Sequence, residues 1–282
     1  MAFLHQLDVV AYRLVVGVWD LYWPALVAVG LLTLVERRFP LEANQPWRPW
    51  RFNILWDMGM LAFAVVLSWT LWGELIVWLG SLVHGLPRRM SAPDGRLEQL
   101  TRLALALLAH DFFAYWAHRL QHALPALWVL HQIHHDERHM NAATSLRAQW
   151  LNVPYIQILV LVPMMWLLGY DAMSPAVYVT LGAFQAFTHI NVKCGFGRFS
   201  TLLVSPQYHR IHHARARELH DRNFATMLPL WDILFGTIKA PAPEEYKSTG
   251  LIEIPPSDAF FKAFFQPLVD WSRILRHRSP RA

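Results

Sequence analysis

Hydrophobic residues gather into five long runs that occupy most of the first two thirds of the chain. The runs cover residues 10–34, 54–83, 100–116, 153–168 and 175–187. The first two exceed the roughly 20 apolar residues with which a helix crosses a bilayer. The last two are shorter and are separated by a turn at residues 169–174, a pattern typical of a tight helical hairpin. The pattern predicts an all-α fold, a polytopic membrane helical bundle with about four to five apolar spans.

The composition agrees with a chain whose solvent is partly lipid. Hydrophobic residues make up 55% of the chain and charged residues only 16%, whereas a soluble domain carries about a quarter charged residues. A single cysteine, Cys194, excludes an internal disulfide and a cysteine-based zinc or iron–sulfur site. The N-terminus has no basic segment before its first apolar run, so we expect no cleaved signal peptide.

Basic residues are concentrated towards the C-terminus. The net charge is +5, and 13 of the 25 lysine and arginine residues follow Ile190. An aromatic, amphipathic stretch from Phe260 to Leu275 leads into a basic tail. Beside membrane spans, such a patch favours anionic lipid headgroups, so we expect no nucleic-acid partner. The positive-inside rule then predicts a multi-pass protein of the inner (cytoplasmic) membrane, with its C-terminus on the cytoplasmic side.

Two copies of the pattern HxxHH and one copy of HxxxH carry the clearest chemical signal. The HxxxH box is His118 and His122; the HxxHH boxes are His131, His134 and His135, and His209, His212 and His213. With 15 histidines in 282 residues, two HxxHH boxes arise by chance in about one such chain in a thousand. Residues three and four apart share one face of a helix, so each box presents imidazoles along one edge. Neutral imidazole is the commonest metal ligand in proteins.

The three boxes are expected to meet on the cytoplasmic side of the membrane. The chain must cross the membrane and return between His135 and His209, which the predicted hairpin allows. Eight imidazoles are too many for one tetrahedral zinc ion, which takes four ligands. They suit two metal ions with open positions. Iron is reasonable for imidazole ligands, and ligand type alone also allows zinc or copper.

Five further residues are candidates for the same site. His189 ends the last apolar run, where the chain re-emerges beside the boxes, and is expected to be a ninth metal ligand. Asp111 lies seven residues before the first box, on nearly the same helix face, so its carboxylate is a candidate acceptor for a ligand N–H, with capping or solvation as the alternative. Tyr115 shares that face, either in packing or as a hydrogen-bond donor. Asn191 and Asn223 are candidate weak ligands or hydrogen-bond donors, with turn or capping chemistry as the alternative.

These residues and their flanks resemble the fatty acid hydroxylase/sterol desaturase superfamily of membrane di-iron enzymes. The three boxes match that family's HxxxH, HxxHH and HxxHH. The flanking matches are residues 111–119 (DxxxYWxHR), 127–131 (LWxxH), 187–191 (FxHxN) and 223–237 (NFG…WDxLFGT, with Ala225 in place of the glycine). The likeness covers about residues 99–240. One segment departs from it: bacterial members often read RxHPxE after the second box, whereas this chain has Arg147-Ala-Gln149-Trp-Leu-Asn152.

The resemblance implies an O2-dependent oxidoreductase that hydroxylates or desaturates a C–H bond of a lipid, such as a sterol or a fatty acyl chain. It implies two iron ions held by the box histidines and O2 as co-substrate, with zinc as an alternative occupant in the isolated protein. The chain has no flavin, nicotinamide or haem-domain signal, so we expect a separate electron donor: a ferredoxin, a cytochrome or a reductase. An ether-lipid cleaving monooxygenase would use the same boxes. A zinc-binding or non-catalytic membrane protein is the alternative from a different class.

The motifs also divide the chain into three parts. Residues 1–98 are expected to form N-terminal membrane helices. Residues 99–240 are expected to form the histidine-box domain, with the boxes in a cytoplasmic helical cap. Residues 241–282 are expected to form a basic amphipathic tail.

Overall fold

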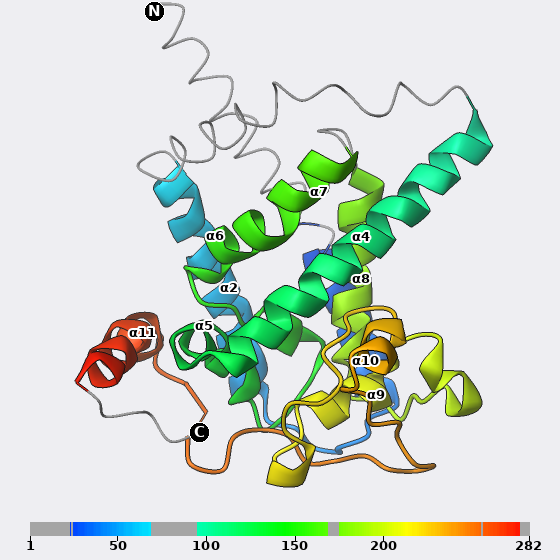
Figure 1. Ribbon diagram of the computed structural model, residues 1–282. Helices are drawn as coiled ribbons and strands as arrows, with labels where there is room; N and C mark the ends of the chain where they lie inside the picture. The colour runs from blue at the N-terminus through cyan, green and yellow to red at the C-terminus, as the bar shows by residue number, and fades with distance from the viewer. Residues whose placement is uncertain (1–22, 24, 69–94, 169–174, 255, 277–282) are drawn as a thin grey trace, which may run out of the picture.

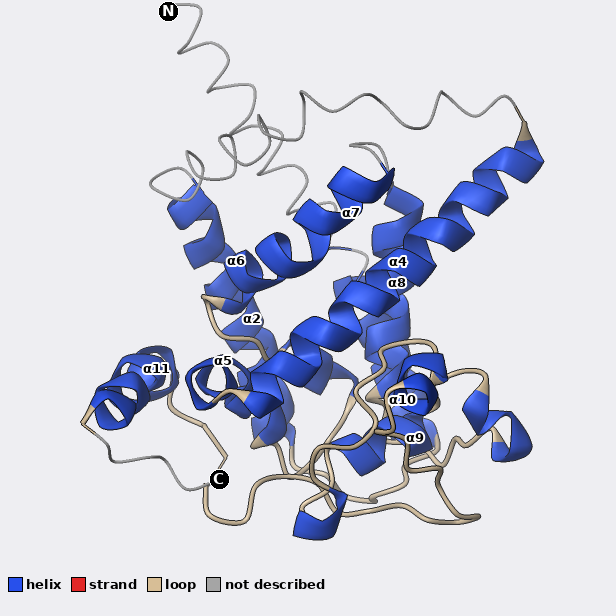
Figure 2. Ribbon diagram, in the orientation of Figure 1, coloured by secondary structure: helices blue, strands red, loops and turns tan. Residues whose placement is uncertain are grey.

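Long helices fill one end of the molecule, and short helices joined by loops fill the other (Figure 1). The computed structural model describes residue 23 and residues 25–68, 95–168, 175–254 and 256–276. These residues are mostly helical, and none of them belongs to a β-strand (Figure 2). The all-α prediction is therefore confirmed for the described part of the chain.

The first two histidine boxes lie on consecutive helices. Helix α4 (Arg96–Ala123) contains the third apolar run and continues through the HxxxH box. It ends at Leu124, and Pro125 begins α5 (Pro125–His135). Proline has no N–H and a fixed φ, so it ends one helix and suits the first turn of the next. This short junction brings the second box, at the end of α5, back beside the first.

Both arms of the predicted hairpin are helical. The residues that join them, 169–174, lie outside the described residues. The first arm runs through α6 (Asn152–Ile156), a π-helical turn η2 (Gln157–Leu161) and α7 (Val162–Leu168). The second arm is α8 (Pro175–Thr188). Both arms pack against α4 through a buried cluster of Ala106, Ala117, Val160, Met164 and Val177. Helix α8 therefore delivers His189, which follows its last residue, to the level of the boxes.

Shorter elements carry the third box. Helix α9 (Pro206–His212) contains most of it, with His213 at its C-terminal end. The Ser205 side chain caps this helix by accepting a hydrogen bond from the N–H of Tyr208 (3.1 Å). Residues 25–38 are also helical. Further elements are α2 (Trp47–Ser68), η1 (Ala142–Leu146), η4 (Gly197–Thr201), η5 (Arg217–Leu219), α10 (Leu230–Leu234) and α11 (Phe260–Leu275). The last of these lies beside α5 (Figure 1).

The predicted membrane spans fall only partly on this structure. Among the helices of the described ranges, none is both long enough and apolar enough to cross a bilayer. The first apolar run falls largely on residues 1–22 and 24, and the second continues into residues 69–94, all outside the described residues. The polytopic bundle and the division of the chain at residues 98 and 240 therefore stay predictions.

Candidate metal centre

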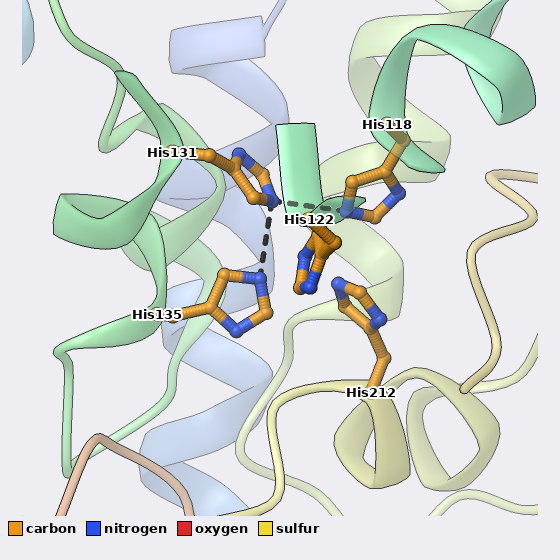
Figure 3. A group of neighbouring side chains, drawn as sticks. All are labelled: His118, His122, His131, His135 and His212. Carbon is orange, nitrogen blue, oxygen red and sulfur yellow. Dashed lines mark hydrogen bonds between the residues drawn. The ribbon is translucent and has the colours of Figure 1, made fainter. Parts of the chain in front are cut away.

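Nine histidine side chains converge from α4, α5, α9 and the end of α8, and they divide into two groups. The five-histidine group consists of His118, His122, His131, His135 and His212 (Figure 3). The four-histidine group consists of His134, His189, His209 and His213. Within each group, one ring nitrogen from every residue lies within 4.8 Å of all the others. The structure thus brings together all nine histidines that were predicted as ligands.

Each HxxHH box contributes to both groups. In each box, the first and last histidines belong to one group and the middle histidine belongs to the other. On α5 the outer pair joins the five-histidine group and His134 joins the four-histidine group. In the third box the assignment is reversed, with His212 in the five-histidine group. Positions four apart differ by about 40° around a helix, whereas adjacent positions differ by about 100°, so the outer pair stays together and the middle imidazole turns away.

Backbone carbonyl groups fix the tautomers of three histidines. Nδ1 of His118, His189 and His212 lies 2.9, 2.7 and 2.8 Å, respectively, from a carbonyl oxygen. The three carbonyl groups belong to Phe224, Gln185 and Arg222. A carbonyl oxygen only accepts hydrogen bonds, so Nδ1 carries the proton of each neutral ring. Nε2 of these rings then offers its lone pair to the centre of its group.

Within the two histidine groups, four buried ring nitrogens have no hydrogen-bond partner among the described residues. They are Nε2 of His122, His212 and His213, and Nδ1 of His209. Figure 3 shows the rings of His122 and His212 turned towards the other imidazoles of the five-histidine group. A buried nitrogen without a partner costs about 1–3 kcal/mol. The three Nε2 atoms therefore fit a site in which a cation binds their lone pairs.

Distances between the ring nitrogens also suit metal coordination. His131 Nε2 lies 2.9 Å from Nε2 of His118 and 3.1 Å from Nε2 of His135 (Figure 3). In the other group, His189 Nε2 lies 3.1 Å from Nε2 of both His134 and His209. A metal ion bound at about 2.0–2.1 Å by each imidazole places adjacent ligand nitrogens about 3 Å apart. The residues present fit one metal ion in each group.

Burial keeps these imidazoles neutral. Loss of hydration is the main cause that lowers the pKa of every histidine in both groups. It lowers the pKa of His118 to about 3 and that of His189 to about 4. The nearby ring of His122 lowers the pKa of His118 further, because two charged imidazoles would repel each other. Neutral imidazole is the form that binds metal.

Asp111 does not make the expected hydrogen bond with a ligand ring. Its carboxylate accepts hydrogen bonds from the N–H groups of Met227 and Leu228 (both 2.8 Å) and from the indole of Trp231 (3.0 Å). Seven residues of helix separate it from His118 by about 10 Å along the axis, which an aspartate side chain cannot bridge. The angle around the helix, which suggested the contact, takes no account of this rise along the axis. Asp111 instead anchors the segment before α10 onto α4.

Tyr115 and Asn223 belong to the same buried scaffold. Tyr115 Oη lies 2.9 Å from Oγ1 of Thr237. Asn223 has a left-handed backbone (φ 58°) and is buried. Its side chain donates to the carbonyl of Lys239 (2.9 Å) and accepts from the N–H of the same residue (2.7 Å). Neither side chain belongs to a histidine group: Tyr115 donates its hydroxyl hydrogen to Thr237, which itself donates to Asp232, and Asn223 serves in turn chemistry.

Asn191 ties the chain after His189 to the N-terminal part. Its side chain accepts a hydrogen bond from the N–H of Glu42 (2.9 Å) and donates one to the carbonyl of Glu42 (3.0 Å). Its own N–H donates to Oε1 of Glu36, which also accepts from the N–H of Ala142 (both 2.7 Å). Asn191 therefore lies outside both histidine groups and holds the turn that follows His189.

Three carboxylates that were not predicted from the sequence support the site: Glu36, Asp221 and Asp232. Asp232 is buried and accepts hydrogen bonds from the N–H groups of Phe224 and Ala225. Asp221 lies against a ring of the five-histidine group. Its place close after the third box is a signal that could have been used. Glu36 gave no such signal, because its two partners are 106 and 155 residues away.

The segment that departs from the bacterial pattern connects the boxes to their surroundings. Arg147 is buried and forms an ion pair with Asp136, the residue after the second box. The Gln149 amide donates to a backbone carbonyl of α11 (2.7 Å). Asn152 accepts a hydrogen bond from Gln121 (2.8 Å), which precedes the second histidine of the first box. These residues make the contacts that position α5 and the end of α4.

Known proteins match the part of the chain that carries this site. The sequence model of a family described as fatty acid hydroxylase matches residues 103–237. Alkylglycerol monooxygenase of Homo sapiens is 34% identical over 139 residues, 48% of this chain and 30% of that protein. Ornithine lipid hydroxylase of Rhizobium tropici is 31% identical over 144 residues, 50% of this chain and 42% of that protein. A very-long-chain aldehyde decarbonylase of Oryza sativa is 31% identical over 170 residues, 54% of this chain and 27% of that protein.

These matches are confined to the histidine-bearing region. The chain spans 27–42% of the length of the three relatives, and no solved structure gives a significant match. All nine histidines of the two groups lie inside the matched segment. The likeness to the fatty acid hydroxylase family is thus shown for residues 103–237 of this chain.

Proposed function

We propose that the protein is a membrane-bound, di-iron oxygenase that uses O2 to hydroxylate a C–H bond of a lipid. One observation carries the proposal: nine buried, neutral imidazoles form two adjoining groups, each with the spacing of a metal site. The five-histidine group has more ligands than a tetrahedral zinc ion takes, which favours iron. Bound iron would supply the O2 reduction and the oxidising power that an unactivated C–H bond requires.

The chain itself contributes orientation and a dry environment. The carbonyl groups of Phe224, Gln185 and Arg222 hold the Nδ1 protons of three ligands, so that each Nε2 faces its group. Buried carboxylates hold the loop that supplies the carbonyls of Phe224 and Arg222: Asp232 accepts from the N–H of Phe224, and Asp111 holds the segment that follows. These contacts fix the ligand rings before a metal ion binds, which limits the reorganisation that binding and reaction require.

The substrate is proposed to be a membrane lipid. Two of the relatives are named for the oxidation of lipids, an alkylglycerol and an ornithine lipid. Hydroxylation uses O2, two electrons and two protons, and it places one oxygen atom in the product and one in water. Desaturation of the same carbon chain would use the same inputs, remove two hydrogens and release two waters. The electrons are proposed to come from a separate ferredoxin, cytochrome or reductase.

Ether-lipid cleavage is a second candidate, favoured by the likeness to alkylglycerol monooxygenase. A hydroxyl group placed on the carbon beside an ether oxygen gives a hemiacetal. The hemiacetal then separates into an aldehyde and an alcohol without further oxidation. Cleavage therefore needs the same site and differs only in which carbon of the lipid is oxidised.

The cellular arrangement is part of the proposal. Residues 1–98 are proposed to form membrane helices, 99–240 the oxygenase unit and 241–282 a basic amphipathic tail. The boxes and the C-terminus are proposed to lie on the cytoplasmic side of the inner membrane. The excess of basic residues after Ile190 supports that orientation.

The decisive experiment compares lipid extracts of cells that express the protein under ¹⁸O2 with extracts of cells that express His134→Ala or His212→Ala. Mass spectrometry should find a lipid that gains one labelled oxygen and that is absent with either variant. Loss of two hydrogens would identify desaturation, and a released fatty aldehyde would identify ether cleavage. If both variants made as much product as the wild type, the metal hypothesis would fail.

His139→Ala is the matched control. His139 follows the second box closely, but it belongs to neither histidine group and its side chain is 42% exposed. This variant should therefore keep wild-type product formation. Metal analysis after anaerobic purification separates the zinc-binding alternative: bound zinc without O2 consumption would overturn the oxygenase proposal.

A further inference from the structure

Helix α11 presents two different faces, and the protein covers only one of them. On the covered side, Ala263 is 1% exposed and Asp270 is 2% exposed. The rings of Phe260 and Trp56 on α2 have centroids 5.1 Å apart, and the Trp271 indole donates to the carbonyl of Ala126 in α5 (2.8 Å). The helix is therefore held in a fixed orientation against α2 and α5.

The uncovered side of α11 carries a stripe of large apolar side chains. Phe261 is 75% exposed, Phe265 51%, Leu268 50% and Leu275 82%. At 100° per residue, these four positions fall within an arc of about 80° on the helix. Such a contiguous exposed patch marks a binding surface in a soluble environment, or a surface that lies in lipid.

Positive charge lies along one edge of this stripe. Three basic side chains are exposed there: Lys262, Arg273 and Arg276. They fall within an arc of about 60° on the helix, which begins about 20° beyond Phe265. The acidic residue of the helix, Asp270, is on the covered side. An apolar arc with a cationic edge is the pattern of a helix that lies in the plane of a membrane, with its cations among anionic headgroups.

The neighbouring helix extends the apolar surface. Leu55 and Met58 of α2 are 59% and 54% exposed, on the turns of α2 that carry Trp56 and Gly59. The Trp56 ring packs against Phe260 of α11, and Phe260 fills the space that a Cβ at position 59 would take. The turns of α2 that pack against α11 therefore carry further exposed apolar side chains, and their sequence belongs to the second apolar run.

We infer that α11 is an interfacial helix that binds the surface of a bilayer containing anionic lipids. The stripe Phe261, Phe265, Leu268 and Leu275 lies at the boundary of the acyl chains, and the cationic edge contacts the headgroups. A second copy of the chain would bury an apolar stripe but give no partner to the charges of Lys262 and Arg276, whereas Arg273 already pairs with Asp270. An acidic protein would match the charges but not the four exposed apolar side chains.

The covered face of α11 links this surface to the metal site. Asp270 accepts a hydrogen bond from the side chain of Gln132 (2.7 Å), which lies between the first and second histidines of the second box. The Trp150 indole donates to the carbonyl of Phe264 (3.1 Å). A bilayer that holds α11 therefore also positions α5 relative to the membrane.

The test uses the full chain in lipid nanodiscs, with a nitroxide spin label at Phe265→Cys in a Cys194→Ser background. Glu218→Cys, an exposed site on η5, is the matched control. In discs that contain phosphatidylglycerol, the label at position 265 should collide several-fold less often with a water-soluble nickel reagent, and more often with O2, than the control label. Equal nickel accessibility at the two sites would overturn the inference. So would spin–spin coupling between labels at position 265 that persists in detergent, because it would assign the stripe to a second copy.

A second variant tests the charges. Lys262→Gln combined with Arg276→Gln leaves Arg273, which contacts Asp270, in place. In discs with phosphatidylglycerol, these changes should raise nickel accessibility at position 265 to the value found in pure phosphatidylcholine. An unchanged accessibility would overturn the role of anionic lipid. Wild-type metal content in both labelled chains would show that the protein remains folded.

Discussion

Nδ1 of His122 lies 3.3 Å from Oδ1 of Asp221, a carboxylate whose side chain is 71% exposed. Three other histidines of the two groups, His118, His189 and His212, donate instead to neutral backbone carbonyl groups. An anionic acceptor makes the ring a stronger donor of electron density to a metal than a carbonyl acceptor does. Among these four histidines, His122 is therefore the one whose ring is influenced by a side chain at the surface.

Asp221→Ala should weaken metal binding by the five-histidine group about 10-fold to 100-fold, because it removes the contact that orients the His122 ring. Asp221→Asn should have a smaller effect, since asparagine also tolerates the left-handed backbone found here (φ 58°) and keeps an acceptor oxygen. Titration with a competing chelator measures both. Asp258→Asn, an exposed carboxylate paired with Arg48, serves as the control and should leave the affinity unchanged. Equal affinities for all three variants would show that Asp221 does not support the site.

Two adjacent residues should affect different metal ions. His212 belongs to the five-histidine group and His213 to the four-histidine group. Each alanine variant should lower the metal content from about two ions per chain to about one. The substitution removes a ligand from one group only, and the other group keeps all of its ligands. The spectra of the remaining iron, measured by Mössbauer spectroscopy, should differ between His212→Ala and His213→Ala. Identical spectra would contradict the division into two groups.

Removal of Glu36 should destabilise the turn that holds His189. Glu36→Ala leaves the buried N–H groups of Ala142 and Asn191 without their acceptor, at a cost of about 1–3 kcal/mol for each group. Burial raises the pKa of Glu36 to about 7, so Glu36→Gln should cost much less: it is neutral and keeps an acceptor oxygen. Chemical unfolding in detergent measures both variants. A Glu36→Gln variant as unstable as Glu36→Ala would argue for a role of the charge instead.

The stability of the metal-depleted protein should decrease as the pH is lowered. Burial lowers the pKa of His118 to about 3 and that of His189 to about 4, against an ordinary value of 6.5. Below pH 6.5 the unfolded chain therefore binds protons that the folded chain does not. As the pH falls, each such group then lowers the free energy of unfolding by about 1.4 kcal/mol per pH unit, until its folded-state pKa is reached. Stability is fully present above pH 6.5 and is lost as the pH falls towards 4.

Unfolding midpoints of protein dialysed against a chelator, measured between pH 8 and pH 5, check this expectation. His189→Asn should flatten the dependence, because it removes one of the depressed groups. His139→Asn should leave the dependence unchanged, since His139 lies outside both groups. A stability that rises as the pH falls from 6.5 would contradict the buried, neutral state of the imidazoles.

Local patterns predicted the described helices correctly, and they identified the nine histidines that the structure brings together. Apolar runs marked the arms of the hairpin and α4, because a helix that packs against other helices needs an apolar surface. Spacings of three and four placed the box histidines on shared helix faces, and the end of the last apolar run identified His189. These inferences required only the identities of residues that lie close together in the sequence.

Hydrogen-bonding partners were not predictable in the same way. The angular position of Asp111 suggested a contact with His118, but the rise of the helix separates the two residues, and the carboxylate binds Met227 and Leu228 instead. Glu36 was missed because both of its partners come from distant segments. A buried carboxylate accepts from whichever N–H groups the fold brings near it, and sequence spacing does not report these.

By itself, the sequence determined that nine histidines would be available at helix ends, in an apolar chain that resembles membrane di-iron enzymes. Only the tertiary structure decided which histidine belongs to which group. The division follows from the 100° step between adjacent helix positions together with the crossing of α4, α5, α8 and α9. That crossing turns the middle imidazole of each HxxHH box away from the outer pair. The same packing decided which face of α11 is covered by protein and which face is left exposed.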